Sequence, residues 1–428
     1  MTGHSLRLAG SAILNLFPKL TALFRIPVAP GAGGRLPREP DYWRLWIVGV
    51  IIFIVRWIEI LAIAIFVYQR TSSAFIVAFL MMLRMAPMGL FGAFLGDFAD
   101  RIERRTGLIL MVGIMLATSI ILALLAHFDR LEVWHLGVAS FIHGIVWAAD
   151  NPIRRMMIGE VVGSDRMATA MSIDIGTNNA SRVAGPTIGG LLLATIGIYG
   201  AFAIGAAMYV VALAVAFMIR ARNAPMHHAS GGMLARIAEG VRLAQTNERL
   251  RGTLIITLVF NLFGWPFSSM IPVLGQDNLH LGPAGIGILA STEGIGAFCG
   301  AIVIALFVGP AHYARIYIGG VFIYQASLTL FALSPHSVPA GIALMLTGVG
   351  GACFAIMQTT LIYQTVAPAM RGRMLGVLTV CIGINPIGFV HVGLLAELIG
   401  AQWATVTTGV EGLICMLLTR RYWKALGA

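Results

Sequence analysis

A short charged segment between two long apolar runs constrains this chain more than any other feature. The segment covers residues 96–105 and reads Gly-Asp-Phe-Ala-Asp-Arg-Ile-Glu-Arg-Arg, and the apolar runs beside it cover residues 73–95 and 107–127. Each run is long enough to cross a bilayer as a helix, which takes about 20 apolar residues. So short a connection makes the two helices antiparallel neighbours. Its arginines are expected in the cytoplasm, because cationic loops resist translocation.

The composition of the whole chain agrees with a membrane protein. Of its 428 residues, 58% are hydrophobic and 11% are charged, whereas about a quarter is charged in soluble domains. The net charge of +11 does not indicate a nucleic-acid partner, because the basic residues fall mainly between apolar runs, where they set topology and contact anionic lipid headgroups. The sequence has no C-x-x-C, H-E-x-x-H or P-loop pattern, so we expect no disulfide, metal site, cofactor, nucleotide engine or enzymatic activity.

We predict an all-α polytopic membrane protein with twelve transmembrane helices in two pseudo-symmetric six-helix bundles, and with both termini in the cytoplasm of a cell-membrane protein. The predicted domains are a cytoplasmic N-terminal extension with an interfacial helix (1–45), a first bundle (46–220), a cytoplasmic linker with an amphipathic helix (221–252), a second bundle (253–419) and a cytoplasmic tail (420–428). The predicted spans are 46–68, 73–95, 107–127, 134–153, 170–195, 199–220, 253–274, 284–308, 314–333, 338–362, 374–398 and 402–419.

An internal repeat relates the two predicted bundles. The pattern Gly-Leu-Leu-x3-Ile-Gly-x3-Ala begins at Gly190 and recurs from Gly393, and at the same offset Gly185 falls on Gly388. The two copies lie where the chain leaves the fifth and the eleventh span, as a duplicated six-helix unit requires. Such repeats underlie alternating access, with the substrate site near the midplane between the halves.

The segment 96–105 resembles the signature loop of the major facilitator superfamily, G-x-L-A-D-R-x-G-R-R, although Glu103 stands where the family usually has glycine. The run 185–190, Gly-Pro-Thr-Ile-Gly-Gly, resembles the end of the motif that marks exporters of the superfamily. The resemblance implies a conformational-switch loop formed by Gly96, Asp100, Arg101, Arg104 and Arg105. It also implies a helix-five motif of Asp174, Asn178, Arg182, Gly185, Pro186, Gly189 and Gly190.

The runs 68–74 (Tyr-Gln-Arg-Thr-Ser-Ser-Ala) and 151–155 (Asn-Pro-Ile-Arg-Arg) resemble a particular branch of the superfamily, the enterobactin-exporter-like and macrolide-efflux-like permeases. The resemblance implies proton-coupled efflux of an amphiphilic small molecule, of the drug or siderophore class, by alternating access. The expected partners are that substrate, protons and membrane lipids, and a monomer is expected. Two alternatives stay open: a mover of lysophospholipid or another lipid, and a non-transporting membrane receptor on the same scaffold.

Ionisable residues inside a membrane helix cost about 2.5–3.5 kcal/mol each on insertion scales, so each is a functional candidate. Polar neutral residues suit either a cavity wall or an interhelical hydrogen bond. Glu397 and Glu411 are weaker candidates, because they lie nearer the outer ends or on variable faces. The candidate proton or substrate site comprises Arg56, Glu59, Arg84, Asp150, Glu293, Asn261, Gln325 and Gln358.

Three contacts are predicted for these residues, from their spacing along a helix or from their depth in the membrane. Arg56 and Glu59 lie three apart and are able to pair with each other. Asp150 is expected to hold Arg154, Arg84 or a neighbouring helix end. Arg182 is expected to pair with Glu293 rather than with Asp174, which lies eight residues back on its own helix, about 12 Å away.

The resemblance to the major facilitator superfamily implies that the fifth and eighth spans meet at the contact between the bundles, and both spans carry paired small residues. Gly185 and Gly189 on the fifth span, and Gly296 and Gly300 on the eighth, are each four residues apart. Small residues let two helices approach closely. We therefore expect these four glycines at the contact between the bundles.

Overall fold

The computed structural model describes residues 39–101, 103–163, 166–220, 233–367 and 370–427. The side chains of residues 92–101, 151, 152, 168 and 233–237 lie outside that description. The predicted interfacial helix before residue 39 and the start of the predicted linker therefore lie outside the described residues. The part of the chain that is described is mainly helical, and none of it forms a strand.

Five long helices form the first bundle. The first helix begins at Pro40, earlier than predicted, and α6 holds both the fifth and the sixth predicted span, which meet at Gly197 with a φ of 69°. The helices are α2 (Pro40–Thr71), α3 (Ala74–Arg101), α4 (Arg104–His127), α5 (Val133–Val162) and α6 (Met167–Phe217).

The second bundle contains two spans that are broken where the sequence predicts continuous helices. The seventh span passes from α-helix into a π-helical turn and a 3-10 turn, and the eleventh is interrupted between Ile382 and Asn385. Pro266 contributes to the first break, because proline has no backbone N–H. The elements are α7 (Met233–Thr246), α8 (Glu248–Val259), η2 (Phe260–Gly264), η3 (Trp265–Ser269), α9 (Met270–Asp277), α10 (Pro283–Phe307), η4 (Pro310–His312), α11 (Tyr313–Leu333), α12 (Ser337–Thr365), α13 (Arg371–Ile382), α14 (Asn385–Ile399), α15 (Ala401–Leu418) and α16 (Arg420–Leu426).

The described helices include nine segments that are long and apolar enough to cross a membrane. One of them, Thr169–Phe217, contains the turn at Gly197 and so comprises two crossings. The helices α5 and α15 are not among the nine, yet α5 packs on α3 and α15 packs on α11 inside their bundles. The chain is an all-α polytopic membrane protein.

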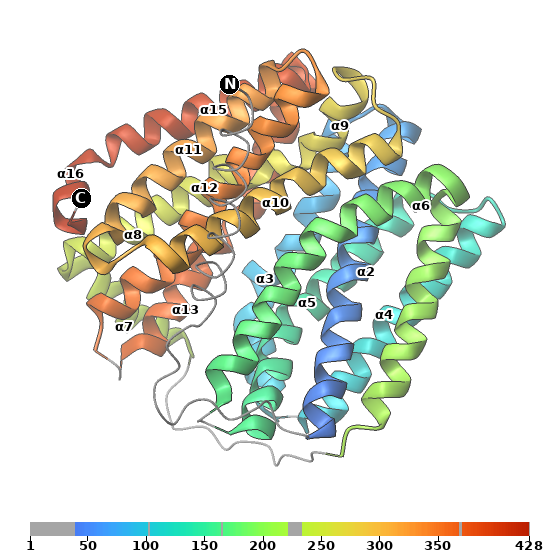
Figure 1. The fold of residues 1–428 in the computed structure, drawn as a ribbon, viewed down its shortest axis with the longest axis horizontal. Helices are drawn as coiled ribbons and strands as arrows, with labels where there is room; N and C mark the ends of the chain where they lie inside the picture. Colours follow the sequence, from blue (N-terminus) through green and yellow to red (C-terminus); the bar gives the residue numbers. More distant parts are fainter. Residues whose placement is uncertain (1–38, 102, 164–165, 221–232, 368–369, 428) are drawn as a thin grey trace, which may run out of the picture.

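The two bundles lie side by side, with the first at the right of Figure 1 and the second at the left. Within the first bundle, α2 and α4 pack on α6, and α3 packs on α5. Within the second, α12 packs on α10 and α11. The bundles touch mainly where α6 packs on α10 and where α3 packs on α14.

Equivalent glycines of the repeat make equivalent backbone contacts. Gly197 and Gly400 both have positive φ, 69° and 83°, at the turns that end the fifth and eleventh spans. A side chain at Gly190 would collide with α10, and one at Gly393 would press on α3. Each copy of the repeat therefore places one glycine against the opposite bundle.

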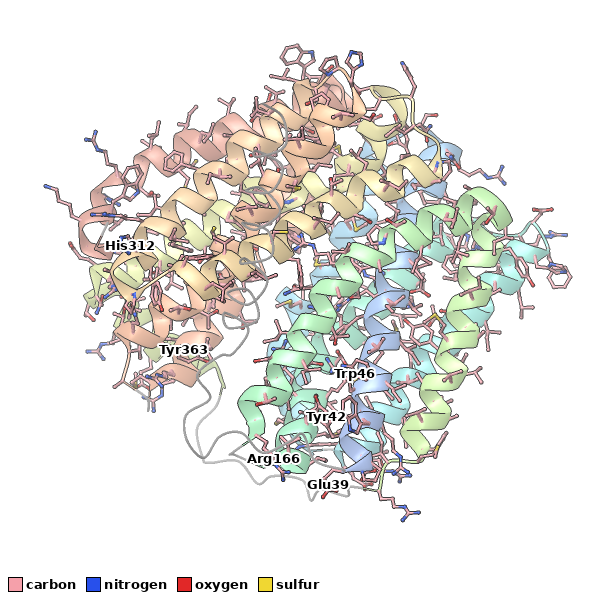
Figure 2. The ribbon with its side chains drawn as sticks, viewed as in Figure 1. Glu39, Tyr42, Trp46, Arg166, His312 and Tyr363 are labelled. Atoms are coloured by element: carbon pink, nitrogen blue, oxygen red, sulfur yellow. The ribbon has the colours of Figure 1, made fainter. Side chains whose placement is uncertain are left out.

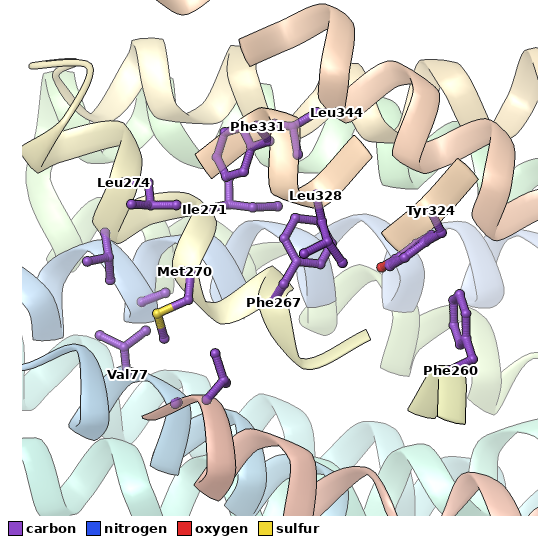
Figure 3. Close-up of a cluster of buried hydrophobic side chains, with 14 of the residues drawn as sticks. Val77, Phe260, Phe267, Met270, Ile271, Leu274, Tyr324, Leu328, Phe331 and Leu344 are labelled. Atoms are coloured by element: carbon purple, nitrogen blue, oxygen red, sulfur yellow. The ribbon is translucent and has the colours of Figure 1, made fainter. Parts of the chain in front are cut away.

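Several aromatic side chains, among them Phe260, Phe267, Tyr324 and Phe331, pack with aliphatic ones in the core of the second bundle (Figure 3). The ring of Phe260 stacks on Phe354 with centroids 3.7 Å apart, and Phe267 meets Tyr324 edge to face at 5.6 Å. Phe260, Phe267 and Tyr324 are buried. Phe260 and Phe267 of the seventh span thus pack on rings of their own bundle.

The two ends of the molecule differ in how the bundles meet. We call the end where α2 and α4 begin the linker end, and the end with Thr71 and Pro283 the far end. At the far end, Tyr68 donates to Asp277, and Ser73 donates to Glu397 at 3.2 Å, both across the bundles. Figure 2 labels Glu39, Tyr42, Trp46 and Arg166 toward the linker end of the first bundle.

The polar contacts described at the linker end stay within one bundle. The buried Arg104 pairs with Glu160 of α5, and Arg105 donates to the carbonyl oxygen of Phe217 at 2.9 Å. In the second bundle, Arg373 pairs with Glu239. Among the described residues, side-chain hydrogen bonds therefore join the two bundles at the far end and not at the linker end.

Candidate functional site

A cavity of about 210 Å³ lies between the bundles and is lined by both of them. A smaller cavity of about 80 Å³ shares Met85, Trp147, Arg182 and Trp265 with it and reaches Glu293. We call the two together the central cavity. Its further lining includes Trp57, Met88, Pro186, Phe260, Asn261, Phe354, Gln358, Asn385 and Phe389.

An ion pair joins the two bundles at the wall of the central cavity. The Nη2 atom of Arg182 on α6 lies 2.7 Å from Oε1 of Glu293 on α10. The guanidinium also lies 5.7 Å from the ring centre of Trp57 and 5.0 Å from that of Trp265. The contact predicted between Arg182 and Glu293 is thus present.

The polar residues of α6 reach three different helices. Asp174 pairs with the fully buried Arg154 of α5, and Asn178 accepts a hydrogen bond from Arg56 of α2 at 2.8 Å. Arg182, one turn further along, reaches α10 instead. The predicted stacking of these residues on one side of α6 is consistent with this geometry, because each lies about one turn beyond the last.

A buried carboxylate pair holds Arg154 in place. Asp150 accepts from Nε of Arg154 at 3.3 Å, one turn away on α5, while Asp174 contacts the terminal nitrogens. Asp150 and Asp174 are each 1% exposed. Asp150 therefore anchors Arg154, one of the partners expected from the sequence.

The expected pairing of Arg56 with Glu59 is wrong. Arg56 faces Asn178 and lies over the rings of Phe53 and Trp147, at 5.1 and 5.0 Å. Glu59 is fully buried on another side of α2, where it accepts a hydrogen bond from Ser119 at 2.7 Å. A spacing of three residues allows two side chains of one helix to pair. Here each side chain instead bonds to a residue of a neighbouring helix, Arg56 to Asn178 and Glu59 to Ser119.

His143 is a site residue that sequence reasoning missed. It is fully buried on α5, and its Nδ1 atom lies 3.3 Å from Oε2 of Glu59. The only signal was a lone histidine within an apolar run. Arg84 on α3 is 2% exposed, and its Nε and Nη1 atoms have no hydrogen-bond partner among the described residues.

In the second bundle, neutral amide side chains make polar contacts at the wall of the central cavity. Asn385 donates to Oδ1 of Asn261 at 3.0 Å, and both line the central cavity, as does Gln358. Gln325 is fully buried against the backbone of Gly412 and lines neither part of the cavity. Of the predicted neutral candidates, Asn261 and Gln358 meet the cavity and Gln325 does not.

The glycine contacts differ from the prediction. Gly296 and Gly300 face Met345 and Val349 of α12, within the second bundle. Gly185 and Gly189 face Trp57 and Ile58 of α2. These four glycines therefore pack helices inside each bundle, which corrects the predicted contact between the bundles.

Other glycines make the contact between α6 and α10. Gly190 lies against Pro283 and Gly287, and Gly287 lies against the carbonyl of Pro186. Gly294 meets the carbonyl of Arg182, next to the ion pair. We call this α6–α10 contact the seam.

The predicted switch loop is only partly described. The backbone of Gly96, Asp100 and Arg101 continues α3 as a helix, but their side chains lie outside the described residues. Arg104 and Arg105 connect the start of α4 to α5 and to the end of α6.

The chain is similar to known transporters in sequence. A family model described as "Transmembrane secretion effector" matches residues 37–424. Macrolide efflux protein A of Streptococcus pyogenes is 20% identical over 88% of this chain and 94% of that protein. The multidrug efflux pump Tap of Mycolicibacterium fortuitum is 25% identical over 80% and 86%, and the enterobactin exporter EntS of Shigella flexneri is 26% identical over 66% and 67%.

Solved structures show the same fold. A POT family transporter in complex with 5-aminolevulinic acid superposes with a TM-score of 0.75, at 12% identity over 92% of this chain and 98% of the other. A bacterial homologue of the human lysosomal transporter Spinster superposes with a TM-score of 0.72, at 15% identity over 91% and 98%.

Proposed function

We propose that the chain exports an amphiphilic small molecule by proton-coupled alternating access. The proposal starts from its family: the chain belongs to the transmembrane secretion effector family of the major facilitator superfamily, so it is a membrane efflux transporter and not an enzyme. The lining of the central cavity supports this substrate class. Apolar side chains form most of the wall, several of them methionine or aromatic, and a few amides, a serine and one ion pair supply polar contacts. Such walls suit a ligand with a large apolar body and few polar groups.

The Arg182–Glu293 ion pair is the observation that carries the proposal. It spans the seam, where the side chain of Glu293 is only 8% exposed, and opposite charges attract more strongly there than in water. A proton on Glu293 removes that attraction and frees Arg182, which loosens α6 from α10. Binding of a proton is thereby linked to the relative position of the bundles.

The orientation in the membrane is also part of the proposal. We place the linker end in the cytoplasm, together with both termini, so that the far end, where hydrogen bonds join the bundles, faces outside. Reporter fusions at Ile198 and His336 should then read as external, and fusions at Ala224 and Ala369 as internal. One chain lines the whole central cavity, which supports a working monomer.

Transport into inverted membrane vesicles tests the proposed function. Uptake of a labelled amphiphilic drug is expected to depend on an imposed pH gradient in the wild type. Glu293→Gln, which cannot gain or lose the proton, should bind the drug and lose the gradient-driven uptake.

Glu248→Gln is the matched control, because Glu248 is an exposed carboxylate at the linker end of α8. It should transport as the wild type does. Normal gradient-driven uptake by Glu293→Gln would refute the coupling role, and uptake of labelled lysophospholipid in place of the drug would favour the lipid-moving alternative.

A further inference from the structure

A second hollow of about 400 Å³ opens on the side of the second bundle, away from the central cavity. We call it the lateral groove. Its wall is formed by η2, α14 and α15, through Leu262, Phe263, Ile387, His391, Glu411 and Ile414.

The lateral groove contains a half-exposed acid in a membrane-spanning region. Glu411 Oε2 lies 2.7 Å from Nε2 of His391, and each of the two side chains is 34% exposed. His391 is eight residues before the end of α14 at Ile399, and Glu411 is ten residues after the start of α15 at Ala401. At 1.5 Å per residue these positions are about 12 and 15 Å deep, near the middle of a hydrocarbon core of about 30 Å.

This environment differs from that of the other carboxylates at similar depth. Glu59 is fully buried against Ser119, and the side chain of Glu293 is 8% exposed and paired with Arg182. Glu411 has an imidazole as its partner and an open side toward the surroundings of the helices. An ionisable group at such a depth is costly, so it is a candidate for function.

The same two irregular segments line the lateral groove and the central cavity. In η2, Phe260 and Asn261 meet the central cavity, whereas Leu262 and Phe263 meet the lateral groove. In α14, Asn385 meets the former and Ile387 the latter. One wall, η2 with the start of α14, therefore separates the two hollows.

That wall is made of interrupted helix. The π-helical η2 is followed by the 3-10 turn η3, and α14 starts directly after the break at Gly383. Gly388 of α14 contacts the carbonyl of Leu262, so the two segments touch through backbone. Such π turns are rare and occur frequently at functional sites.

We propose that the lateral groove binds lipophilic organic cations, namely amines with an apolar body, from the lipid phase. Glu411 accepts hydrogen bonds from the ammonium group, and His391 orients the carboxylate through its Nε2 contact. The ring of Phe263, edge to face with His391 at 5.9 Å, offers a π face to the cation. Leu262, Ile387 and Ile414 contact the apolar body.

The groove also gives such an amine a short route to the central cavity, through the wall of η2 and α14. This access role rests on the proposed function, whereas binding in the groove does not. The two are therefore tested by separate measurements.

Photolabelling of the full-length protein in lipid nanodiscs tests the binding. The probes are a long-chain primary amine with a diazirine in its alkyl chain and the alcohol of the same chain length. The amine is expected to label η2, α14 and α15 at the groove, and the alcohol to label them weakly. Glu411→Gln should lower amine labelling about tenfold or more, because a charge-assisted contact is lost.

Further comparisons decide the outcome. Glu411→Asp keeps the carboxylate and should keep the preference for the amine, which separates loss of charge from misfolding, and Glu248→Gln should label as the wild type does. Equal labelling by amine and alcohol, or undiminished labelling of Glu411→Gln, would refute the site. Full export of the amine by Glu411→Gln would refute the access role while leaving efflux itself intact.

Discussion

The first bundle keeps charges in its core, and the second keeps aromatic rings and amides. Among the described residues, the buried charged side chains of the first bundle are Arg56, Glu59, Arg84, Arg104, Asp150, Arg154 and Asp174. In the second bundle only Glu293 is both charged and buried within the described part, and its partner Arg182 comes from the first. The repeat thus preserved backbone contacts between helices but not the chemistry of the cores.

The two kinds of core suggest that the two bundles differ in rigidity. A buried charge requires its partner at a fixed position, because an unpaired charge in a medium of low dielectric is very unfavourable. Stacked rings and amides tolerate small displacements at lower cost. We infer that the first bundle moves as a stiff unit, and that the second adapts its wall to the substrate. Four substitutions test this difference, from the largest expected effect to the smallest.

The buried network of the first bundle should be the most sensitive to mutation. Arg154→Met leaves the carboxylate of Asp150 without Arg154 and that of Asp174 with only Arg155, whose Nε atom lies 3.6 Å away, and should lower the free energy of unfolding by about 3–5 kcal/mol. The measurement is unfolding in mixed detergent micelles. Arg249→Met is the control, since Arg249 makes an exposed hydrogen bond to Gln364 and its loss should change stability by about 0.5 kcal/mol or less. Equal effects of the two changes would contradict a stiff ionic core.

The seam should be the next most sensitive place. Gly190→Leu inserts a side chain where Pro283 and Gly287 already lie, and should disfavour the closed far end by about 1–3 kcal/mol. Distance measurements between spin labels on the two bundles at that end should show a wider separation. Gly176→Ala on the same helix meets no atom within 4 Å and should leave the distances unchanged.

A change in the aromatic wall should alter affinity more than coupling. Phe354→Leu removes the stack with Phe260, a contact worth about 0.5–1.5 kcal/mol. Dissociation constants of different substrates should then change unequally, each by about tenfold or less, while uptake still follows the pH gradient. If uptake by this variant no longer followed the pH gradient, the second bundle would be needed for proton coupling, which would contradict the difference proposed between the bundles.

The smallest effect is expected from the amide pair. Asn261→Ala removes the hydrogen bond from Asn385, and interhelical bonds of this kind average about 0.6 kcal/mol in membranes. The same unfolding assay should give a loss well below that of Arg154→Met. A loss as large as that of Arg154→Met would show that neutral polar groups hold the second bundle as firmly as charges hold the first.

The sequence predicted which polar residues share one side of a helix and which residues of two helices lie at the same depth in the membrane. Asp174, Asn178 and Arg182 follow one another at intervals of one turn, and Arg182 and Glu293 lie at matching depths on the fifth and eighth spans. The depths need only the rise per residue and the order of the spans, whereas the meeting of these two spans was implied by the resemblance to the superfamily. The membrane helps, because it fixes the direction of each helix along one axis.

Rotation of a helix about its own axis was not predictable in the same way. Gly296 and Gly300 are spaced for close packing, yet they face α12, and the seam uses Gly287 and Gly294 instead. A helix in this fold has close neighbours on several sides, and small residues serve each of them. Spacing along the chain does not say which neighbour a stripe of glycines meets.

The sequence by itself determined the class of the protein: its apolar runs, the charged segment at residues 96–105 and the repeat at Gly190 and Gly393 suffice for a duplicated helical membrane transporter. Only the tertiary structure decided that Glu59 turns from Arg56 to Ser119 and His143, that the seventh and eleventh spans break, and that Glu411 and His391 meet in a groove. The physical reason is that the two kinds of interaction act over different distances along the chain. Hydrophobic length and local charge act within one segment, whereas the partner of a buried polar group is chosen by competition among helices that are distant in the chain.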